Sequence, residues 1–277
     1  MSTYGEFYPS SNNDNCTLDM TKGVTGVPAS TIDQNTIWRQ SKFGTSGSQT
    51  VLAGGDSGTH TAGWATTVVN TGFPPPDPIS ALQIQTRSVF LRFDTSSLDD
   101  DLEITGVSLG LYVSAIVNNY SSSFGSPTIR IFAGETGGSD RPTFSSPIST
   151  SADKNWYCEA AGGCGSSSCN ANEGAVDVAT IAHSSLSAGA RNDISLSSGS
   201  YNDWINRTGY TYIWVTHNIL YNTSSSTVCS NANDTVPVSI ANSTAVKTTS
   251  VAFVGGTSGN APYLAINQGK SRFQMVI

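Results

Sequence analysis

The chain has 277 residues, a formal net charge of −7 and only 12% charged residues. Phosphate binding requires a concentrated basic surface, so this composition argues against a nucleic-acid partner. The first residues lack the basic and apolar regions of a cleaved signal peptide, and no window has the ~18 apolar residues of a membrane-spanning helix, so we expect neither an ordinary export signal nor a membrane partner. A chain of this length suits one large all-β domain.

The N-terminal third is expected to be mostly irregular. Residues 1–30 are polar and show no clear periodicity, which predicts an arm outside the domain. A short strand is expected at 50–53. The following stretch, 54–86, is rich in Gly and Thr and contains three consecutive prolines, which cannot donate backbone hydrogen bonds to a sheet. We interpret this stretch as a long loop, either a surface insertion or a contact loop.

Period-2 alternation marks the first strong strands. Val89, Leu91 and Phe93 lie on one side of an extended chain, and the apolar residues at 107, 109, 111 and 113 do the same in the segment 105–116. Such alternation predicts strands that each bury one face.

Further expected strands lie at 128–133, 193–196, 210–217, 236–240, 250–254 and 263–266. Residues 134–175 are expected to form a second long loop. Residues 200–203 resemble a capping box, and Gly209 is placed to end one or two helical turns. The predicted fold class is all-β: an antiparallel jelly-roll-like β-sandwich with long loop insertions and one short helix. We expect a single domain at 31–267, followed by a C-terminal strand or contact segment at 268–277.

Three of the five cysteines lie close together in a Gly- and Ser-rich segment. Their spacing differs from the paired cysteines of zinc knuckles, and no histidine is near in sequence, which disfavours zinc. A disulfide that staples this loop is the favoured interpretation, and free thiols are the alternative. The disulfide candidates are Cys158, Cys164, Cys169 and Cys229.

A resemblance to a known family begins in the strongest strands. Phe-Leu-Arg-Phe-Asp-Thr-Ser-Ser-Leu, followed by Ile-Thr-Gly-Val-Ser-Leu-Gly-Leu-Tyr-Val, resembles the opening of DNRLRE-type β-sandwich domains, a family close to the carbohydrate-binding modules of family 96. The segments 193–209 and 253–266 resemble the later parts of that family, so the resemblance covers about 31–267. The chain departs from the family pattern in the acidic turn at 99–103 and in its enlarged loops.

This resemblance implies a jelly-roll sandwich of antiparallel sheets. Members of the family occur as modules of secreted enzymes, on cell-surface proteins and in phage structural proteins. The resemblance therefore implies a binding or structural role for this chain.

No catalytic signature stands out in the sequence. Residues 55–58 copy the serine-protease tetrapeptide and His60 follows, but the trypsin-like order needs a histidine upstream of the serine, so we interpret the match as coincidence. A metal site of three histidines would have to combine His60, His183 and His217 from distant segments of the chain. His217 follows a strand pattern, and we interpret it as a satisfied edge histidine. The acidic run 99–103 is interpreted as a solvated turn rather than a calcium site. We expect no enzyme activity, no metal and no cofactor.

Two groups of residues are candidates for binding. Trp64, Trp156 and Tyr157 lie in expected loops, where they either stack on sugar rings or anchor their loops. The alternating Phe273, Met275 and Ile277 either augment the sheet edge of a neighbour or form a strand within the same sandwich.

These features favour a non-enzymatic virion structural protein. It would be a capsid decoration (cement) protein, or a tail or fibre component of a tailed phage, that stabilises or decorates the particle through protein contacts. The expected partners are further copies of the chain, with a trimer favoured, and other virion proteins such as the major capsid protein. The alternative is an extracellular carbohydrate-binding module or cell-surface adhesin with a glycan partner, and a secreted hydrolase is a disfavoured second alternative.

Overall fold

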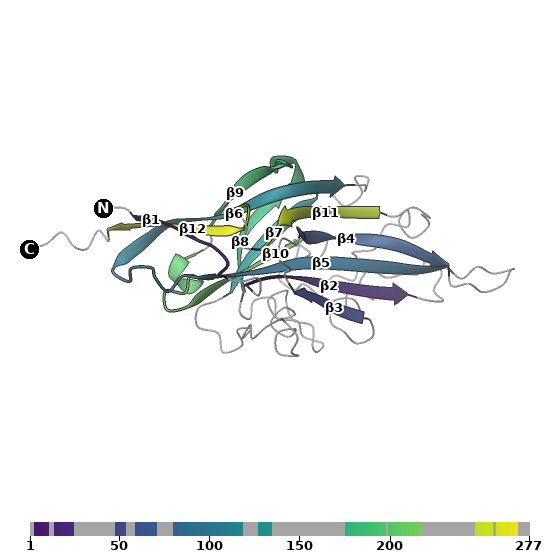
Figure 1. Ribbon diagram of the computed structural model, residues 1–277, viewed down its shortest axis with the longest axis horizontal. Coiled ribbons are helices and arrows are strands. Elements are labelled where there is room, and N and C mark those ends of the chain that lie inside the picture. Colours follow the sequence, from purple (N-terminus) through teal and green to yellow (C-terminus); the bar gives the residue numbers. More distant parts are fainter. Residues whose placement is uncertain are drawn as a thin grey trace, which may run out of the picture.

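A computed structural model of the chain (Figure 1) describes the following residues: 3–10, 14–24, 48–53, 59–70, 80–118, 127–134, 175–197, 199–217, 247–256 and 259–270. For 3, 16–24, 48–53, 64–70, 80–86, 88, 175, 247–248 and 270 it describes the backbone and not the side chains.

The described part of the chain is all-β, and each strand pairs with its neighbours in antiparallel orientation, which confirms the predicted fold class at the level of a sandwich-like, curled sheet. The strands are β1 (Thr3–Phe7), β2 (Asn15–Val24), β3 (Ser48–Ala53), β4 (Thr59–Asn70), β5 (Ser80–Asp94), β6 (Leu102–Asn118), β7 (Thr128–Gly134), β8 (Ala175–Ala182), β9 (Ala190–Leu196), β10 (Tyr210–His217), β11 (Lys247–Val254) and β12 (Tyr263–Lys270).

Two long strands, β5 and β6, organise the sheet. The first half of β6 pairs with β12 and its second half with β11, while β9 lies along the opposite edge of β6. The first half of β5 pairs with β4 and its second half with β10, while β2 runs along the opposite edge. The resulting order is β1-β12-β6-β11-β4-β5-β10-β7-β8.

The sheet encloses one hydrophobic core. Strand twist curls such a long sheet on itself, and buried side chains from β6, β9 and β12 meet those from β5, β7 and β10. Val89, Leu91 and Phe93 are fully buried, as the alternation predicted. Each large apolar side chain removed from water contributes about 1.5–3 kcal/mol. The core therefore depends on the same period-2 pattern that identifies the strands.

The prediction of an arm at 1–30 is wrong for the residues described there. Thr3–Phe7 forms β1 against β12, and Asn15–Val24 forms β2 against β5. A signal for β2 is present in the sequence, because Cys16, Leu18 and Met20 alternate with polar residues. The polar composition of the flanking residues conceals it.

The expected long loop at 54–86 is also corrected. It contains β4 and the first part of β5, and these two strands pair with each other from Gly63 to Asn70. The Thr and Val residues of β4 favour extended structure through their branched Cβ atoms. They gave no clear alternation of apolar and polar residues, which is why the strand was missed.

The expected short helix is a single 3-10 turn, η4 (Tyr201–Asp203). Ser200 is its N-cap, and its side chain accepts a hydrogen bond from the backbone N–H of Asn202 at 3.3 Å. The turn ends at the buried Trp204, so Gly209 does not terminate it, and the Gly209 carbonyl instead accepts a hydrogen bond from the backbone N–H of Thr95 at 3.0 Å. A second 3-10 turn, η3 (His183–Ser185), follows β8.

The contact between β4 and β11 depends on a glycine. A Cβ on Gly63 would overlap the backbone carbonyl oxygen of Thr249 and the side chain of Ser250. We expect Gly63→Ala to lower the free energy of unfolding by about 1–3 kcal/mol, the usual cost of overpacking, as measured by urea denaturation. Gly259→Ala is the control, because nothing lies within 4 Å of its added Cβ. Equal stability of the two variants would contradict this packing.

Candidate functional site

A strip of two tyrosines and a carboxylate runs along β1. Tyr4, Glu6 and Tyr8, which directly follows the strand, alternate with Gly5 and Phe7. Tyr4 is 59% exposed and Tyr8 is 44% exposed. The two tyrosine hydroxyls converge on one side chain: Tyr4 donates to Oε1 of Glu6 at 2.8 Å, and Tyr8 donates to Oε2 at 2.6 Å. Large aromatic rings thus remain open to solvent in a fixed arrangement.

The strip continues across β12, β6 and β9. The rings of Tyr8 and Tyr263 have centroids 5.6 Å apart. The strand register aligns Tyr263 with Gly110 and Gly110 with Asp193, and the Tyr263 hydroxyl crosses β6 to donate to Oδ1 of Asp193 at 2.6 Å. Gly110 makes this possible, because a Cβ there would overlap the Tyr263 ring.

Arg191 packs on the same aromatic cluster. Its guanidinium carbon lies 4.9 Å from the centroid of the Tyr263 ring. Its two terminal nitrogens donate to the carbonyl oxygens of Ala261 at 3.3 Å and Gly259 at 3.0 Å, so the charge is directed at the chain that leads into β12. We name this set the tyrosine face, and it consists of Tyr4, Glu6, Tyr8, Arg191, Asp193 and Tyr263.

The pKa values of all three phenols on the tyrosine face are raised above the ordinary value of 10. The bond to Glu6 raises the pKa of Tyr4 to about 12 and also raises the pKa of Tyr8. In return, the hydrogen bonds from Tyr8 and Tyr4 lower the pKa of Glu6. Burial, followed by the bond to Asp193, raises the pKa of Tyr263. At neutral pH the face therefore presents neutral aromatic rings around the ionised carboxylate of Glu6.

A hollow of about 470 Å³ borders the tyrosine face at Asp193. It is lined by residues of β8 and β9, and near it the backbone N–H of Ser197 donates to the carbonyl of Val178 at 2.9 Å. Thr180 and Ser195 contribute hydroxyl groups to its lining. The hollow thus extends the face with a polar edge.

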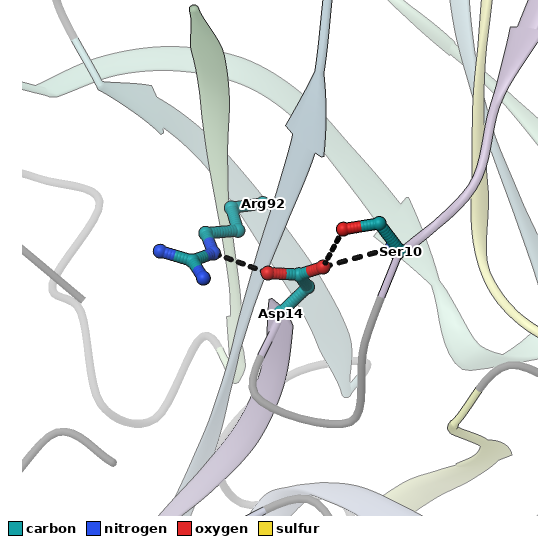
Figure 2. Close-up of polar contacts among 3 residues, drawn as sticks. All are labelled: Ser10, Asp14 and Arg92. Atoms are coloured by element: carbon teal, nitrogen blue, oxygen red, sulfur yellow. Dashed lines mark hydrogen bonds and ion pairs between the residues drawn. The ribbon is translucent and has the colours of Figure 1, made fainter. Parts of the chain in front are cut away.

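Asp14, which directly precedes β2, takes part in a buried ion pair. Oδ2 of Asp14 accepts hydrogen bonds from the backbone N–H and the hydroxyl of Ser10, at 2.8 and 2.7 Å, and Oδ1 pairs with Nε of Arg92 on β5 (Figure 2). The side chain of Asp14 is only 1% exposed. Arg92 also lies over the ring of Tyr210, 4.6 Å from its centroid. The ion pair ties the chain between β1 and β2 to the opposite part of the sheet.

The three histidines are buried, and one of them is held by an asparagine. Nε2 of His60 lies 2.6 Å from Oδ1 of Asn15, an oxygen that also accepts the backbone N–H of Gly256 at 3.0 Å. His60 therefore makes a structural contact, and Ser57 lies outside the described residues. The interpretation of His217 as an edge histidine is wrong, since β10 lies between β5 and β7 and the side chain is fully buried against His183.

The acidic run 99–103 includes a turn that leads into β6. The carbonyl oxygen of Asp99 accepts hydrogen bonds from Arg207 and, at 2.8 Å, from Nε2 of Gln268. Its side chain accepts the backbone N–H of Asp101 at 2.9 Å. Among the described residues, no three His, Cys, Asp or Glu side chains gather as ligands for one metal ion.

Most of the other sequence candidates lie outside the residues that the structure describes, and the predictions on them stay predictions. They are Cys158, Cys164, Cys169, Cys229, Trp156, Tyr157, Phe273, Met275 and Ile277. The backbone of Trp64 lies in β4, opposite Thr249 of β11, and not in a loop as expected.

The residues of the tyrosine face were missed in the sequence. Tyr4, Glu6 and Tyr8 carry a short period-2 signal, but it lies within a polar segment that we expected to be irregular. The bond between Tyr263 and Asp193 joins residues 70 positions apart. It depends on strand register, for which the sequence holds no local signal.

Comparison with protein-family models and with curated proteins gave no match for this chain. The resemblance to DNRLRE-type domains therefore stays a prediction. Within the described residues, no helix has the length and apolar character that crossing a membrane requires.

We expect the ion pair of Asp14 to contribute strongly to stability. Asp14→Ala leaves Arg92 partly buried without its carboxylate and removes the acceptor of Ser10, and breaking a buried pair from one side costs about 3–5 kcal/mol. Urea denaturation should show a loss of this order. Ser10→Ala, which removes one hydroxyl donor, should cost only about 1 kcal/mol. A loss in Asp14→Ala no larger than in Ser10→Ala would contradict a central role for the pair.

The buried histidines predict a loss of stability in weak acid. Burial lowers the pKa of His60 and His183 to about 4 and that of His217 well below its ordinary value of 6.5. Above pH 6.5 these groups are neutral in both states and contribute nothing. Between pH 6.5 and 4 the unfolded chain binds protons that the folded chain excludes, so stability falls by about 1.4 kcal/mol per pH unit for each histidine.

Urea denaturation at several pH values between 7.5 and 4.5 measures this dependence. His60→Gln should reduce the slope by roughly one third, since it removes one of three such groups. A stability that stays constant down to pH 4.5 would contradict the burial of the three side chains.

Proposed function

We propose that this chain is a non-enzymatic glycan-binding protein and that the tyrosine face holds the sugar. The observation that carries the proposal is the pair of exposed rings, Tyr4 and Tyr8, with the carboxylate of Glu6 between them. Aromatic rings offer apolar faces to sugar rings, and fixed polar groups at the same place orient the ligand.

The tyrosine face is rigid and extended, as a platform for a sugar chain needs to be. The backbone positions of residues four apart in an extended chain are separated by about 13 Å, and the rings of Tyr4 and Tyr8 converge from these positions on Glu6, so we propose that they contact neighbouring units of an oligosaccharide. Both rings are already held by Glu6, so little conformational entropy is lost when a ligand binds.

The charges of the face favour a neutral or N-acetylated glycan. Glu6 and Asp193 supply carboxylate acceptors for sugar hydroxyls, and the nitrogens of Arg191 donate to backbone carbonyls. With the net charge of −7, such a face repels uronic-acid and sulfated glycans. We therefore propose neutral polysaccharides and N-acetylated glycans as the ligand class.

A structural role in a virion is the second candidate, and the position of β1 favours it. This strand lies at one end of the strand order and, among the described residues, pairs with β12 alone. An exposed sheet edge beside tyrosines is suited to pairing with another chain. Under this proposal the partners are further copies and other virion proteins, and a virion protein that grips host glycans would combine both roles.

The glycan proposal is tested by calorimetric titration with neutral, N-acetylated and uronic-acid oligosaccharides. We expect binding to at least one neutral or N-acetylated ligand. Tyr8→Ala should weaken it by about 1–3 kcal/mol, a typical contribution of a stacked aromatic ring, and Tyr4→Ala should weaken it similarly. Tyr8→Phe keeps the ring and should retain most of the affinity.

Tyr212→Ala is the matched control, because Tyr212 lies on β10 in the other half of the sheet. It should leave the affinity unchanged. Absence of binding to every neutral and N-acetylated oligosaccharide, or binding that Tyr8→Ala and Tyr4→Ala do not weaken, would contradict the proposal.

A further inference from the structure

His183 is buried, and the two nitrogens of its imidazole ring make no hydrogen bond within the described part of the chain. It begins η3, directly after β8, where its backbone N–H donates to the carbonyl of Pro127 at 2.9 Å. The residue is 6% exposed, and neither Nδ1 nor Nε2 has a hydrogen-bond partner among the described residues. A buried polar group left unpaired costs about 1–3 kcal/mol. In native proteins such a group commonly indicates a bound water or ion.

His217, at the end of β10, lies against this ring. The two imidazole centroids are 5.0 Å apart and the rings are inclined at 83°. With a metal–nitrogen bond of about 2.0–2.1 Å, a metal lies about 3.2 Å from the centre of each ring that binds it, and a tetrahedral angle then places two ring centres about 5.2 Å apart. The observed separation of 5.0 Å is close to this value, and it also lies in the range of ordinary edge-to-face ring pairs.

We propose that His183 and His217 form a binding site for a transition-metal ion, with Zn²⁺ and Cu²⁺ as the ions best suited to it. Imidazole is a preferred ligand of both. Two histidines supply half of a tetrahedral set, and the remaining positions are left to water. The site goes beyond glycan binding and lies apart from the tyrosine face.

The surroundings of the two rings suit metal binding. The side chains of His183 and His217 are both more than nine-tenths buried, so an ion between the two rings would be shielded from bulk solvent. On the neighbouring strand β7, the charge of Arg130 is paired with Asp177 and lies beside the ring of Phe132.

A bound ion would join two parts of the fold that the chain connects only indirectly. His183 belongs to the segment that links β8 to β9, while β10 lies between β5 and β7. A metal bound to both rings would link the end of β8, the last strand in the sheet order, to β10. Because the ion binds the folded chain, it should raise the melting temperature.

The test is titration of the full chain, freed of metal, with CuCl₂ and ZnCl₂, with MgCl₂ as the negative control. We expect one Cu²⁺ per chain, an electron paramagnetic resonance spectrum with two nitrogen ligands, and a higher Tm. His183→Asn should weaken binding by at least ~100-fold, since losing a ligand costs more than the 10–100-fold typical of a lost outer partner. His60→Gln keeps the pair and should bind as the parent chain does.

The spectrum of the unaltered chain needs no variant, so this part of the test remains valid even if His183→Asn fails to fold. The proposal is overturned if Cu²⁺ and Zn²⁺ fail to bind, if the spectrum shows fewer than two nitrogen ligands, or if His183→Asn binds as tightly as His60→Gln. None of these results bears on glycan binding, which is measured separately at the tyrosine face.

Discussion

The arrangement of this molecule depends on how the chain crosses from one part of its sheet to the other between β1 and β2. β1 is paired with β12, whereas β2 is paired with β5, and the residues between them must span the two. Asp14 fixes the end of this crossing, because its buried carboxylate accepts two hydrogen bonds from Ser10 and pairs with Arg92. Removing one partner of a buried ion pair is strongly destabilising, so the pair holds Ser10, just after β1, beside Arg92 of β5.

The tyrosine face follows from this constraint. Once β1 is held against β12, its alternating side chains bring Tyr8 onto Tyr263, and the register of β6 brings Tyr263 to Asp193. Each phenol on the face is then bound to a carboxylate, which fixes the rings at little further cost. Recognition is thus proposed to come from rigid strands rather than from mobile loops.

Some strands of this fold can be predicted from the sequence, because their buried apolar residues alternate along the chain. In the strands around Val89 and Leu109, every second residue belongs to the hydrophobic core, so the apolar alternation predicts these strands. The sequence of β4 has no such alternation, so it predicts a loop where the structure has a strand. The candidate site has no local sequence signal, because Tyr8, Tyr263 and Asp193 come from three segments that are distant in the sequence. Their meeting is decided by register across Gly110, which no local pattern records.

The central claim is that residues 3–7 form a fixed strand that carries the binding face. Amide hydrogen exchange of Thr3–Phe7 tests it most directly, measured with and without a bound oligosaccharide. The account predicts alternate protected amides in the free chain, because β1 is hydrogen-bonded to β12, and stronger protection when the ligand is present. Rapid exchange of all these amides in both states would show a free N-terminal arm and would contradict the account.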